Sequence, residues 1–341
     1  NEDESSKQFF SRHFGSGFTE KFVAAIANGI WAGDITTLSA RTAFPEIWGI
    51  DQQYGSLLLG GVLRGIKRWK KPRPAFQGTI SFQNGLRELV DALSGELAAG
   101  TFKPECEVIE ITNGEKHAAV SYSKNETVHR VEFERVILTA NGEKLSHILP
   151  SSDGELAASA LRIPFSPIGL LHLGISSKNV EHPLDGFGFL VPPFLKTTLL
   201  GCVFNSSLFP NRAPDGRHLL TCFVGGALHP AEADVRDTKL QQKVFAELDQ
   251  LLGLRETPQV IDATFLPAAI PNYPLRHFEF EEKLESFHRQ NPRIRIASSS
   301  GRGIGVPARV REGLAAARQI SLDFDQTALT ENAQHALRNR K

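Results

Sequence analysis

A predicted strand, a glycine-rich loop and a predicted helix follow one another in RIRIASSSGRGIGVPARVREGLAAARQI, and this order constrains the fold more than any other feature. Glycines at 301, 303 and 305 let the backbone approach a ligand closely, and Pro307 suits the first turn of a helix. A helix N-terminus carries about half a positive charge, so such a loop can bind an anion. These loops usually open a nucleotide-binding domain, whereas this one lies near the C-terminus. It is therefore either a ligand contact or only a tight turn.

The composition is that of an ordinary globular protein of 341 residues, long enough for two or three domains. Lys+Arg 38 balance Asp+Glu 38, so the net charge does not favour nucleic-acid binding. No apolar run reaches the roughly 18 residues that cross a bilayer. The chain contains no Met, so we expect it to be a piece of a longer protein. The cysteines form no CxxC pair, which argues against a metal site or a disulfide scaffold and favours a reducing compartment. They are Cys106, Cys202 and Cys222.

Residues 1–70 are predicted to be helical, because large apolar side chains recur there at the spacing of one helix face. These are Phe9, Phe10, Phe14, Phe18, Phe22 and Ile26. We expect this stripe to belong to the core.

A basic and apolar stretch, 57–71, follows. Its cations, with those just after it, are Arg64, Lys67, Arg68, Lys70, Lys71 and Arg73, and its apolar residues include Leu57, Leu58, Leu59, Val62, Leu63, Ile66 and Trp69. The stretch is either a solvated helix face or an amphipathic element on an anionic membrane, where each basic residue would add about 1 kcal/mol.

The rest of the chain mixes helices and strands, so the predicted fold class is α/β in the mixed α+β sense. SFQNGLRELVDALSGEL has helical spacing, and CEVIEIT, AAVSYS and RVEFERVILTA are strand-like. A region rich in strands follows from 161 to about 269, with one clear helix, TKLQQKVFAELDQLLG. The polar tail after Phe324 is expected to fray.

Five ordered blocks carry a resemblance to a known family. They are NGIWAGD with LSARTAFP and YGSLL, then GFGFLVP, then FNSSLFPNRAP, then TCFVGG, then IPNYPLRHF. The chain resembles the oxygen-dependent, FAD-containing protoporphyrinogen oxidases, within the amine-oxidase-like flavoproteins, from about residue 3 to residue 320.

The resemblance implies an FAD-binding domain of the amine-oxidase type, assembled from separated segments and incomplete in this sequence, with a mixed-sheet substrate domain and a helical membrane-binding domain. Residues 1–73 would be the helical domain and 161–289 mainly the substrate domain. Residues 74–160 and 290–322 would be parts of the FAD-binding domain, and 323–341 a tail. On this scheme the membrane interpretation of 57–71 becomes the favoured one.

The resemblance also implies cofactor contacts. Val108 matches a position that contacts adenine through its backbone, although alone it would be a buried strand residue. Phe278 stands where the family often has Trp beside the flavin. Ile304, Gly305 and Val306 match the loop that meets the isoalloxazine and phosphate region, where a helix N-terminus would stabilise an anionic reduced flavin.

Four positions match those that border the tetrapyrrole in the family: Gly29, Leu190, Val203 and Phe223. Their chemistry suits a flat apolar slot, because Leu and Val clamp ring faces, Phe stacks and Gly admits a ring edge. Each alone would be read as a packing residue. Together they form a pocket hypothesis, with no metal.

Departures from the family pattern occur at Ser298-Ser299, Asn84-Gly85 and Ala308-Arg309. The family's G-x-G-x-x-G fingerprint is not found in these 341 residues. We therefore expect this stretch alone to bind FAD poorly.

The function implied is FAD-dependent oxidation of protoporphyrinogen IX to protoporphyrin IX with O2 as acceptor. An alternative activity is the oxidation of coproporphyrinogen III to coproporphyrin. A second alternative is that the protein is a non-catalytic relative that binds a tetrapyrrole or a protein partner. The expected partners are a porphyrinogen, O2 and a membrane surface, without nucleic acid, and a homodimer is left open. The expected location is cytoplasmic and peripheral to a membrane.

Overall fold

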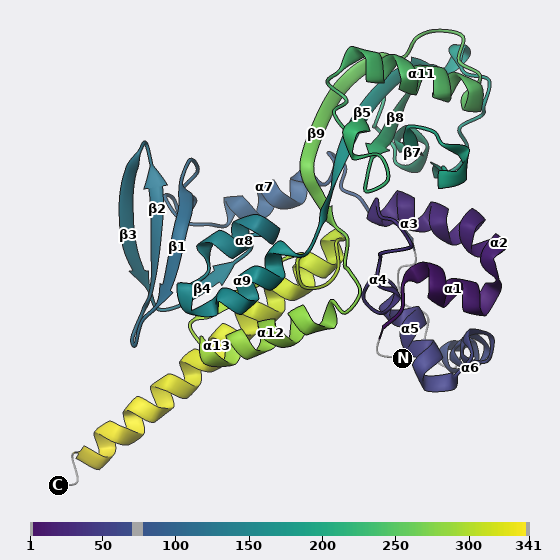
Figure 1. Cartoon of the computed structure of the whole chain (residues 1–341). Helices are drawn as coiled ribbons and strands as arrows, with labels where there is room; N and C mark the ends of the chain where they lie inside the picture. Colours follow the sequence, from purple (N-terminus) through teal and green to yellow (C-terminus); the bar gives the residue numbers. More distant parts are fainter. Residues whose placement is uncertain (1–2, 70–77, 339–341) are drawn as a thin grey trace. The chain divides into compact units, whose positions relative to one another are not determined.

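The computed structural model describes residues 3–69 and 78–338, and the chain divides into two compact units (Figure 1). The first consists of Asn1–Lys103 and Pro164–Arg276, and the second of Pro104–Ile163 and His277–Lys341. The last two residues of the predicted membrane stretch 57–71 lie outside the described residues, as do the side chains of 66–69.

Helices form the N-terminal part of the first unit. In chain order they are α1 (Ser6–Phe14), α2 (Ser16–Phe18), the π-helical turn η1 (Thr19–Val23), α3 (Ala24–Trp31), α4 (Ala40–Ala43), α5 (Pro45–Tyr54), α6 (Leu57–Trp69) and α7 (Arg87–Gly95). The first begins at a capping box, in which Ser5 accepts from the backbone of Gln8 and the Gln8 side chain accepts from that of Ser5. The predicted helical character of this region is confirmed.

The expectation that the aromatic stripe belongs to the core is wrong for most of its members. Phe9 and Phe10 are buried, but Phe14, Phe18 and Phe22 are 40%, 45% and 58% exposed. The helix is interrupted at Gly15, whose φ is +80°, and again by the π-helical turn, so the period that the sequence suggests does not continue in space. After the interruption the buried face is carried by other residues. They are Val23, Ala24, Ala25, Ala27, Asn28 and Trp31.

The first unit also holds a five-stranded antiparallel sheet of order β6-β7-β8-β5-β9. Its strands are β5 (Phe165–Ser176), β6 (Gly188–Leu190), β7 (Leu199–Phe204), β8 (Arg217–Gly225) and β9 (Gln259–Pro271). Short helical turns connect them: η3 (Ser177–Asn179), η4 (Pro193–Leu195), α10 (Asn205–Leu208) and η5 (Pro230–Glu232). The predicted helix is confirmed as α11 (Thr238–Leu252), which begins at the Asp237 cap.

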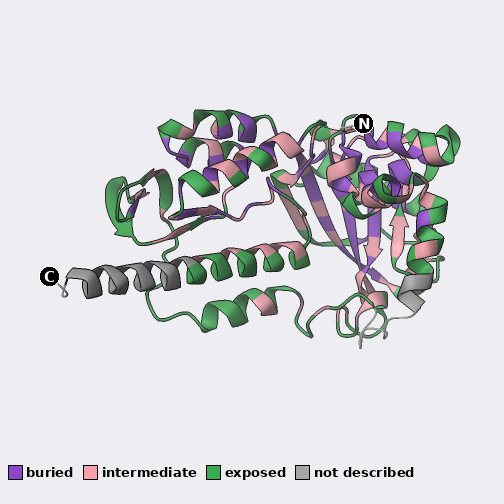
Figure 2. Cartoon of the chain, turned by 90° about the horizontal axis from the view of Figure 1, so that it is seen from below, coloured by how far each residue is buried: buried purple, intermediate pink, exposed green. Residues whose placement is uncertain are grey.

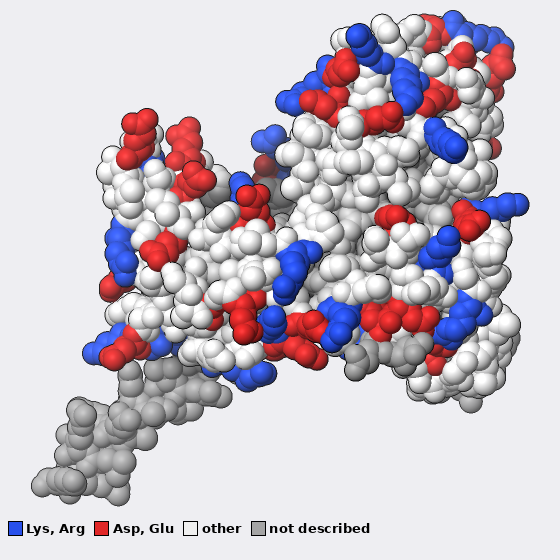
Figure 3. Space-filling view, in the orientation of Figure 1, with Lys and Arg blue, Asp and Glu red and all other residues white. Residues whose placement is uncertain are grey.

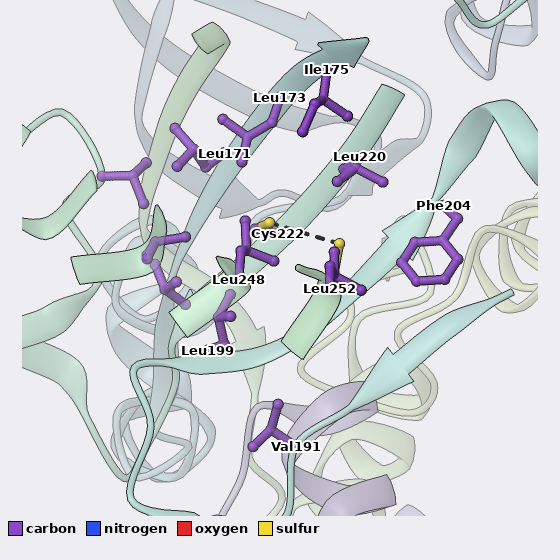
Figure 4. Packing of buried hydrophobic residues seen from close by; sticks show 14 of the residues in the cluster. Leu171, Leu173, Ile175, Val191, Leu199, Phe204, Leu220, Cys222, Leu248 and Leu252 are labelled. Carbon is purple, nitrogen blue, oxygen red and sulfur yellow. Dashed lines mark hydrogen bonds between the residues drawn. The ribbon is translucent and has the colours of Figure 1, made fainter. Parts of the chain in front are cut away.

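Alternate residues of the sheet face α11 and form the main core of this unit (Figure 4). Members from the strands include Leu171, Leu173 and Leu220, and Leu248 and Leu252 come from the helix. The opposite face of the sheet meets the C-terminal end of α3. There Ala32 accepts hydrogen bonds from Ser166 and Ala227, both at 2.8 Å, and packs with Ile168 and Leu200. The two faces therefore have different partners.

The second unit contains a three-stranded antiparallel sheet of β1 (Glu107–Asn113), β2 (Ala118–Lys124) and β3 (Thr127–Phe133). A parallel pair joins β4 (Val136–Leu138) to β10 (Ile294–Ile296), although they are far apart in the sequence. The helices are α8 (Gly142–Ile148), η2 (Ser151–Asp153), α9 (Gly154–Leu161), α12 (Phe278–Gln290) and α13 (Val306–Arg338). The polar tail after Phe324 was expected to fray, but helix α13 continues past that residue. The first turns of α13 are largely exposed (Figure 2).

Among the described helices, none combines the length and the apolar character that crossing a bilayer would require. On the face shown in Figure 3, acidic and basic side chains are interspersed. Local features must therefore carry any preference for a ligand.

Candidate functional site

A cavity of about 370 Å³ opens in the first unit, against the sheet face that meets α3. The four positions Gly29, Leu190, Val203 and Phe223 all line it. Its other lining residues are Ile30, Phe187, Gly188, Phe189, Gly201 and Cys202. The structure thus brings together all four residues of the pocket hypothesis, from α3 and three different strands.

Strand register explains why these residues meet. Directly opposite residues in an antiparallel sheet point to the same face. Leu190 pairs with Gly201, which in turn pairs with Phe223. Gly188 pairs with Val203 in the neighbouring row. Two adjacent rows of the sheet therefore form one wall of the cavity.

Glycines set how closely the walls approach. A Cβ on Gly29 would lie 2.3 Å from Cδ2 of Leu190, so the glycine lets α3 and β6 approach closely without displacing the Leu190 side chain. A Cβ on Gly201 would lie 2.6 Å from the carbonyl oxygen of Phe189. The result is a narrow slot with Leu, Val and Phe side chains on its walls. Such a slot suits the faces of a flat apolar ligand.

No carboxylate, ammonium, guanidinium or imidazole group is among the residues that line this cavity. Its one thiol, of Cys202, is buried on the opposite face, where the Cys222 thiol donates to it at 3.7 Å. That contact and burial raise the pKa of Cys222 well above its usual value. The cavity can therefore position a ligand and exclude water, but its lining supplies no acid or base.

The glycine-rich loop lies in the second unit and is held by buried polar groups. Ser298 donates to Oδ1 of Asn141 at 2.5 Å, and the Ser300 hydroxyl accepts from the backbone N–H of Gly142 at 3.0 Å. His277 is 2% exposed, and its Nε2 donates to the carbonyl of Gly301 at 2.9 Å. Burial lowers the pKa of His277. The loop is thus fixed from two other segments of its unit.

The loop leads directly into α13. Gly303 has φ +75°, a left-handed conformation that favours glycine, and the carbonyl of Gly305 accepts from the backbone of Ala308 and Arg309. Ile304 is half-buried, and Gly305 and Val306 are exposed at the start of the helix. Arg302 forms an ion pair with Glu281 beside the loop. The three predicted cofactor positions therefore present backbone at a helix N-terminus, which favours an anion.

Val108, on β1, lies against a separate cavity of about 610 Å³. Lys144, His147 and Ala140 also line it. The residue after Ala140 is Asn141, whose side chain accepts from Ser298, so this cavity is joined to the loop through one short segment. Phe278 begins α12 directly after His277, one residue from the contact with Gly301.

Several lining residues were not singled out from the sequence. Gly188, Gly201 and Phe187 are among them, and Ile30 follows Gly29 by one position. The alternation within GFGFLVP and LLGCVF could have identified the glycines, because residues two apart on a strand share a face.

Comparison with known proteins connects these observations. The sequence model of the family described as flavin containing amine oxidoreductase matches residues 1–321. The chain belongs to this family. The fold agrees with that membership: the crystal structure of an Exiguobacterium sp. 255-15 protein, provisionally named protoporphyrinogen oxidase, superposes with a TM-score of 0.75 at 21% identity, covering 95% of this chain and 68% of that one. A putrescine oxidase variant superposes with a TM-score of 0.63 at 15% identity, covering 94% and 68%.

Three curated relatives show the range of similarity to this chain. It is 27% identical to the mitochondrial protoporphyrinogen oxidase of Nicotiana tabacum, covering 97% of this chain and 70% of the relative. It is 23% identical to the coproporphyrinogen III oxidase of Bacillus subtilis, covering 92% and 67%. The chain spans 54% of a second tobacco relative, the chloroplastic protoporphyrinogen oxidase, to which it is 29% identical.

Proposed function

We propose that this chain is part of an FAD-dependent oxidase that converts protoporphyrinogen IX to protoporphyrin IX with O2 as acceptor. One observation carries the proposal: the four positions that match the tetrapyrrole contacts of the family line a single apolar cavity. The name of the tobacco relative supports the same substrate. The slot fits a macrocycle, because it offers large apolar side chains on its walls and glycines where the walls approach.

The second unit fits FAD as the cofactor. The backbone at 304–306 and the N-terminus of α13 would face the anionic part of the flavin, and the backbone of Val108 would contact adenine. When bound, FAD accepts the hydride and passes the electrons to O2. The task of this chain's own residues is to hold the macrocycle in its slot, exclude water and keep the loop rigid through Ser298, Ser300 and His277.

The direct test uses the full-length purified protein with protoporphyrinogen IX. We expect fluorescent protoporphyrin to form while oxygen is consumed. A flavin-loaded protein that leaves protoporphyrinogen unchanged beyond its spontaneous oxidation would contradict the proposal.

The pocket is tested by Phe223→Ala. We expect a higher KM or a lower turnover with the flavin still bound, because the change removes an aromatic wall of the cavity. Phe194→Ala is the matched control, since Phe194 is an exposed aromatic residue outside this cavity. Loss of the flavin from the Phe223 variant would instead indicate a packing role.

Coproporphyrinogen III is the second candidate substrate, because the Bacillus subtilis relative carries that name at similar coverage. The two substrates differ in two substituents at the ring edge. These are apolar vinyl groups in protoporphyrinogen IX and carboxylate-bearing groups in coproporphyrinogen III. The lining of the cavity is apolar, which favours the vinyl-bearing substrate. Turnover of each substrate at equal concentration decides between them, and a higher kcat/KM for coproporphyrinogen would replace the proposal.

We also propose that the helical region contacts a membrane surface. In the described part of the stretch 57–71, Leu58, Leu59 and Val62 are exposed. The rings of Phe14, Phe18 and Phe22 form a continuous exposed row, with centroid separations of 5.3 and 5.0 Å. Exposed apolar side chains of this kind can insert at the headgroup boundary.

Sedimentation with phosphatidylserine vesicles tests the membrane proposal. The variant Leu58→Ser with Val62→Ser should bind less than the unchanged protein, and Leu195→Ser, an exposed leucine in η4, serves as the control. Equal binding of all three proteins would overturn this assignment.

A further inference from the structure

A row of polar side chains continues the sheet wall of the cavity toward β9. Val203, a lining residue, lies directly opposite Thr221 on β8, and Thr221 lies directly opposite His172 on β5. The next residue in the row is Asp262 on β9. All four side chains share one face of the sheet, because residues paired across antiparallel strands point the same way. The apolar slot therefore adjoins a polar strip.

Hydrogen bonds fix which nitrogen of His172 carries its proton. The Thr221 hydroxyl donates to Oδ1 of Asn205 at 2.7 Å, which uses its only proton. The contact of 2.9 Å between this hydroxyl and Nδ1 of His172 then requires Nδ1–H to donate. In the neutral ring, Nε2 is consequently an acceptor, and it makes no hydrogen bond to another of the described residues.

The strip lies within reach of a ligand that overfills the slot. His172 and Val203 are two strand spacings apart, about 10 Å. The adjacent row, which runs from Phe223 to Leu170, is apolar and continues the same surface. A macrocycle resting on Val203 and Phe223 would therefore extend over Thr221 toward His172.

The strip offers acceptors rather than donors to such a ligand. Its members Asp262 and His172 present a carboxylate and an imine nitrogen, and the Thr221 proton is already donated. Asp262 also accepts from the Thr264 hydroxyl at 2.7 Å. Arg217 also lies on this face, where its guanidinium is over Gly174 and donates to Gln259 at 3.3 Å. A ligand with N–H groups thus matches this edge.

Reduced and oxidised tetrapyrroles differ in how they present N–H groups. The tetrahedral bridging carbons of the reduced macrocycle let each pyrrole tilt, so its N–H can point out of the mean plane. The oxidised macrocycle is planar and conjugated, and its remaining N–H groups point into the ring. An acceptor on the wall of the binding site can therefore engage the reduced ligand alone.

We propose that His172 accepts a hydrogen bond from an N–H group of the reduced tetrapyrrole and thereby makes the site prefer the reduced ligand to the oxidised one. This inference rests on the proposed function, since it assumes a tetrapyrrole in the slot. Thr221 and Asn205 act as positioning residues, because they hold the His172 tautomer. The preference favours binding of substrate and release of product.

Equilibrium dialysis of the full-length protein tests this. The protein is kept reduced under argon, so that no turnover occurs, and is dialysed against mesoporphyrinogen or mesoporphyrin; the porphyrinogen is then oxidised and quantified by fluorescence. We expect the ratio of the two affinities to fall about two- to tenfold in His172→Phe, the range of one hydrogen bond. His172→Gln keeps an acceptor and should retain most of the preference. Thr221→Val should lower it by removing the partner of Nδ1.

The outcomes separate this inference from the proposed function. An unchanged affinity ratio in both His172→Phe and Thr221→Val overturns the role of His172 while leaving the pocket intact. If the unchanged protein binds neither macrocycle, the tetrapyrrole proposal itself fails, and this inference fails with it. His129→Phe, at an exposed position on β3, is the control and should behave as the unchanged protein. If His172→Phe does not fold, Thr221→Val decides, because valine has nearly the shape of threonine.

Discussion

The cavity of the first unit and the glycine-rich loop of the second are built in opposite ways. The cavity is lined by apolar side chains and glycines, which strand register brings together from distant parts of the chain. The loop is a short contiguous segment whose shape is fixed by buried hydroxyl and imidazole hydrogen bonds. One region presents side chains to a ligand, and the other presents backbone.

This difference indicates how each region should respond to substitution. Apolar walls depend on fit, so a small change in volume alters the cavity or prevents the strands from pairing. A polar loop depends on satisfied hydrogen bonds, so removing one partner leaves a buried group unpaired. The predictions below test that contrast, in order of decreasing effect on the free energy of unfolding.

The largest effect is expected for Gly188→Ala, at the edge of the cavity. Gly188 has φ +136°, and a Cβ there would lie 2.0 Å from the carbonyl oxygen of Cys202, a backbone atom that cannot move aside. We expect a loss of about 3 kcal/mol or more, because the change combines left-handed strain with a break in strand pairing. Denaturant unfolding measures it.

Gly186→Ala is the matched control for this prediction. Its added Cβ would meet only the backbone nitrogen of Gly188, at 4.0 Å, and its φ is not in the left-handed range. Equal unfolding midpoints for the two variants would show that the pairing of β6 with β7 does not depend on Gly188.

Stability of the second unit should fall on acidification because of His288. Its Nε2 accepts from the backbone N–H of Ile296 at 3.0 Å, and burial, with a smaller contribution from Arg295, lowers its pKa to about 4. The unfolded chain takes up this proton near pH 6.5, so the stabilisation is complete above that pH and is lost as pH falls toward 4. We expect a loss on the order of 2 kcal/mol after allowing for partial exposure.

The measurement compares unfolding at pH 7.5 and pH 4.5 for the unchanged protein and for His288→Gln. Glutamine can accept from Ile296 without titrating, so the variant should lose less stability. An identical fall in stability for both proteins would mean that groups other than His288 dominate this range. Glu312 is not one of them, because burial raises its pKa and its protonation therefore favours the folded state at low pH.

Local elements were predictable from the sequence, whereas the pattern of burial was not. Helix α11 and strands β1 to β4 follow from spacing and composition alone. The aromatic stripe was misread because its spacing is regular in the sequence, while Gly15 and the π-helical turn break the phase in space. These interruptions explain why Phe18 and Phe22, which follow Gly15, lie at the surface and not in the expected core.

The cavity residues could be nominated only through the family resemblance. Nothing local distinguishes Val203 or Phe223 from other buried strand residues, because their partnership depends on pairing between β7 and β8. His172 carried no signal for the same reason: its role depends on Thr221 and Asn205, which the sequence places elsewhere. The glycine-rich loop, in contrast, was visible at once because its elements are contiguous.

Ser300→Ala tests the polar loop directly. The Ser300 hydroxyl, which is fully buried, accepts from the backbone N–H of Gly142, and alanine would leave that donor unpaired. We expect a loss of about 1–2 kcal/mol, the usual range for an unsatisfied buried group. Ser299→Ala is the control, because Ser299 is less buried and Asn141 keeps its bond to Ser298; its effect should stay below about 0.5 kcal/mol. Similar losses for both would show that burial of the hydroxyl is not the decisive factor.

Gly29→Ala should change stability least and binding most, which sharpens the contrast between the regions. Its Cβ would lie 2.3 Å from Cδ2 of Leu190, the flexible end of a side chain that is 43% exposed and can therefore turn. Alanine in a helix gains up to about 1 kcal/mol over glycine, which offsets the displacement of Leu190, so the net change in unfolding free energy should be within about 0.5 kcal/mol. The displaced leucine nevertheless narrows the slot, and mesoporphyrin affinity should fall about tenfold, as for an overfilled apolar pocket. Gly49→Ala, where an added Cβ meets nothing within 4 Å, is the control for the stability that alanine gains over glycine within a helix. If Gly29→Ala unfolds the protein instead, the cavity wall is as rigid as the polar loop and the contrast between the two regions does not hold.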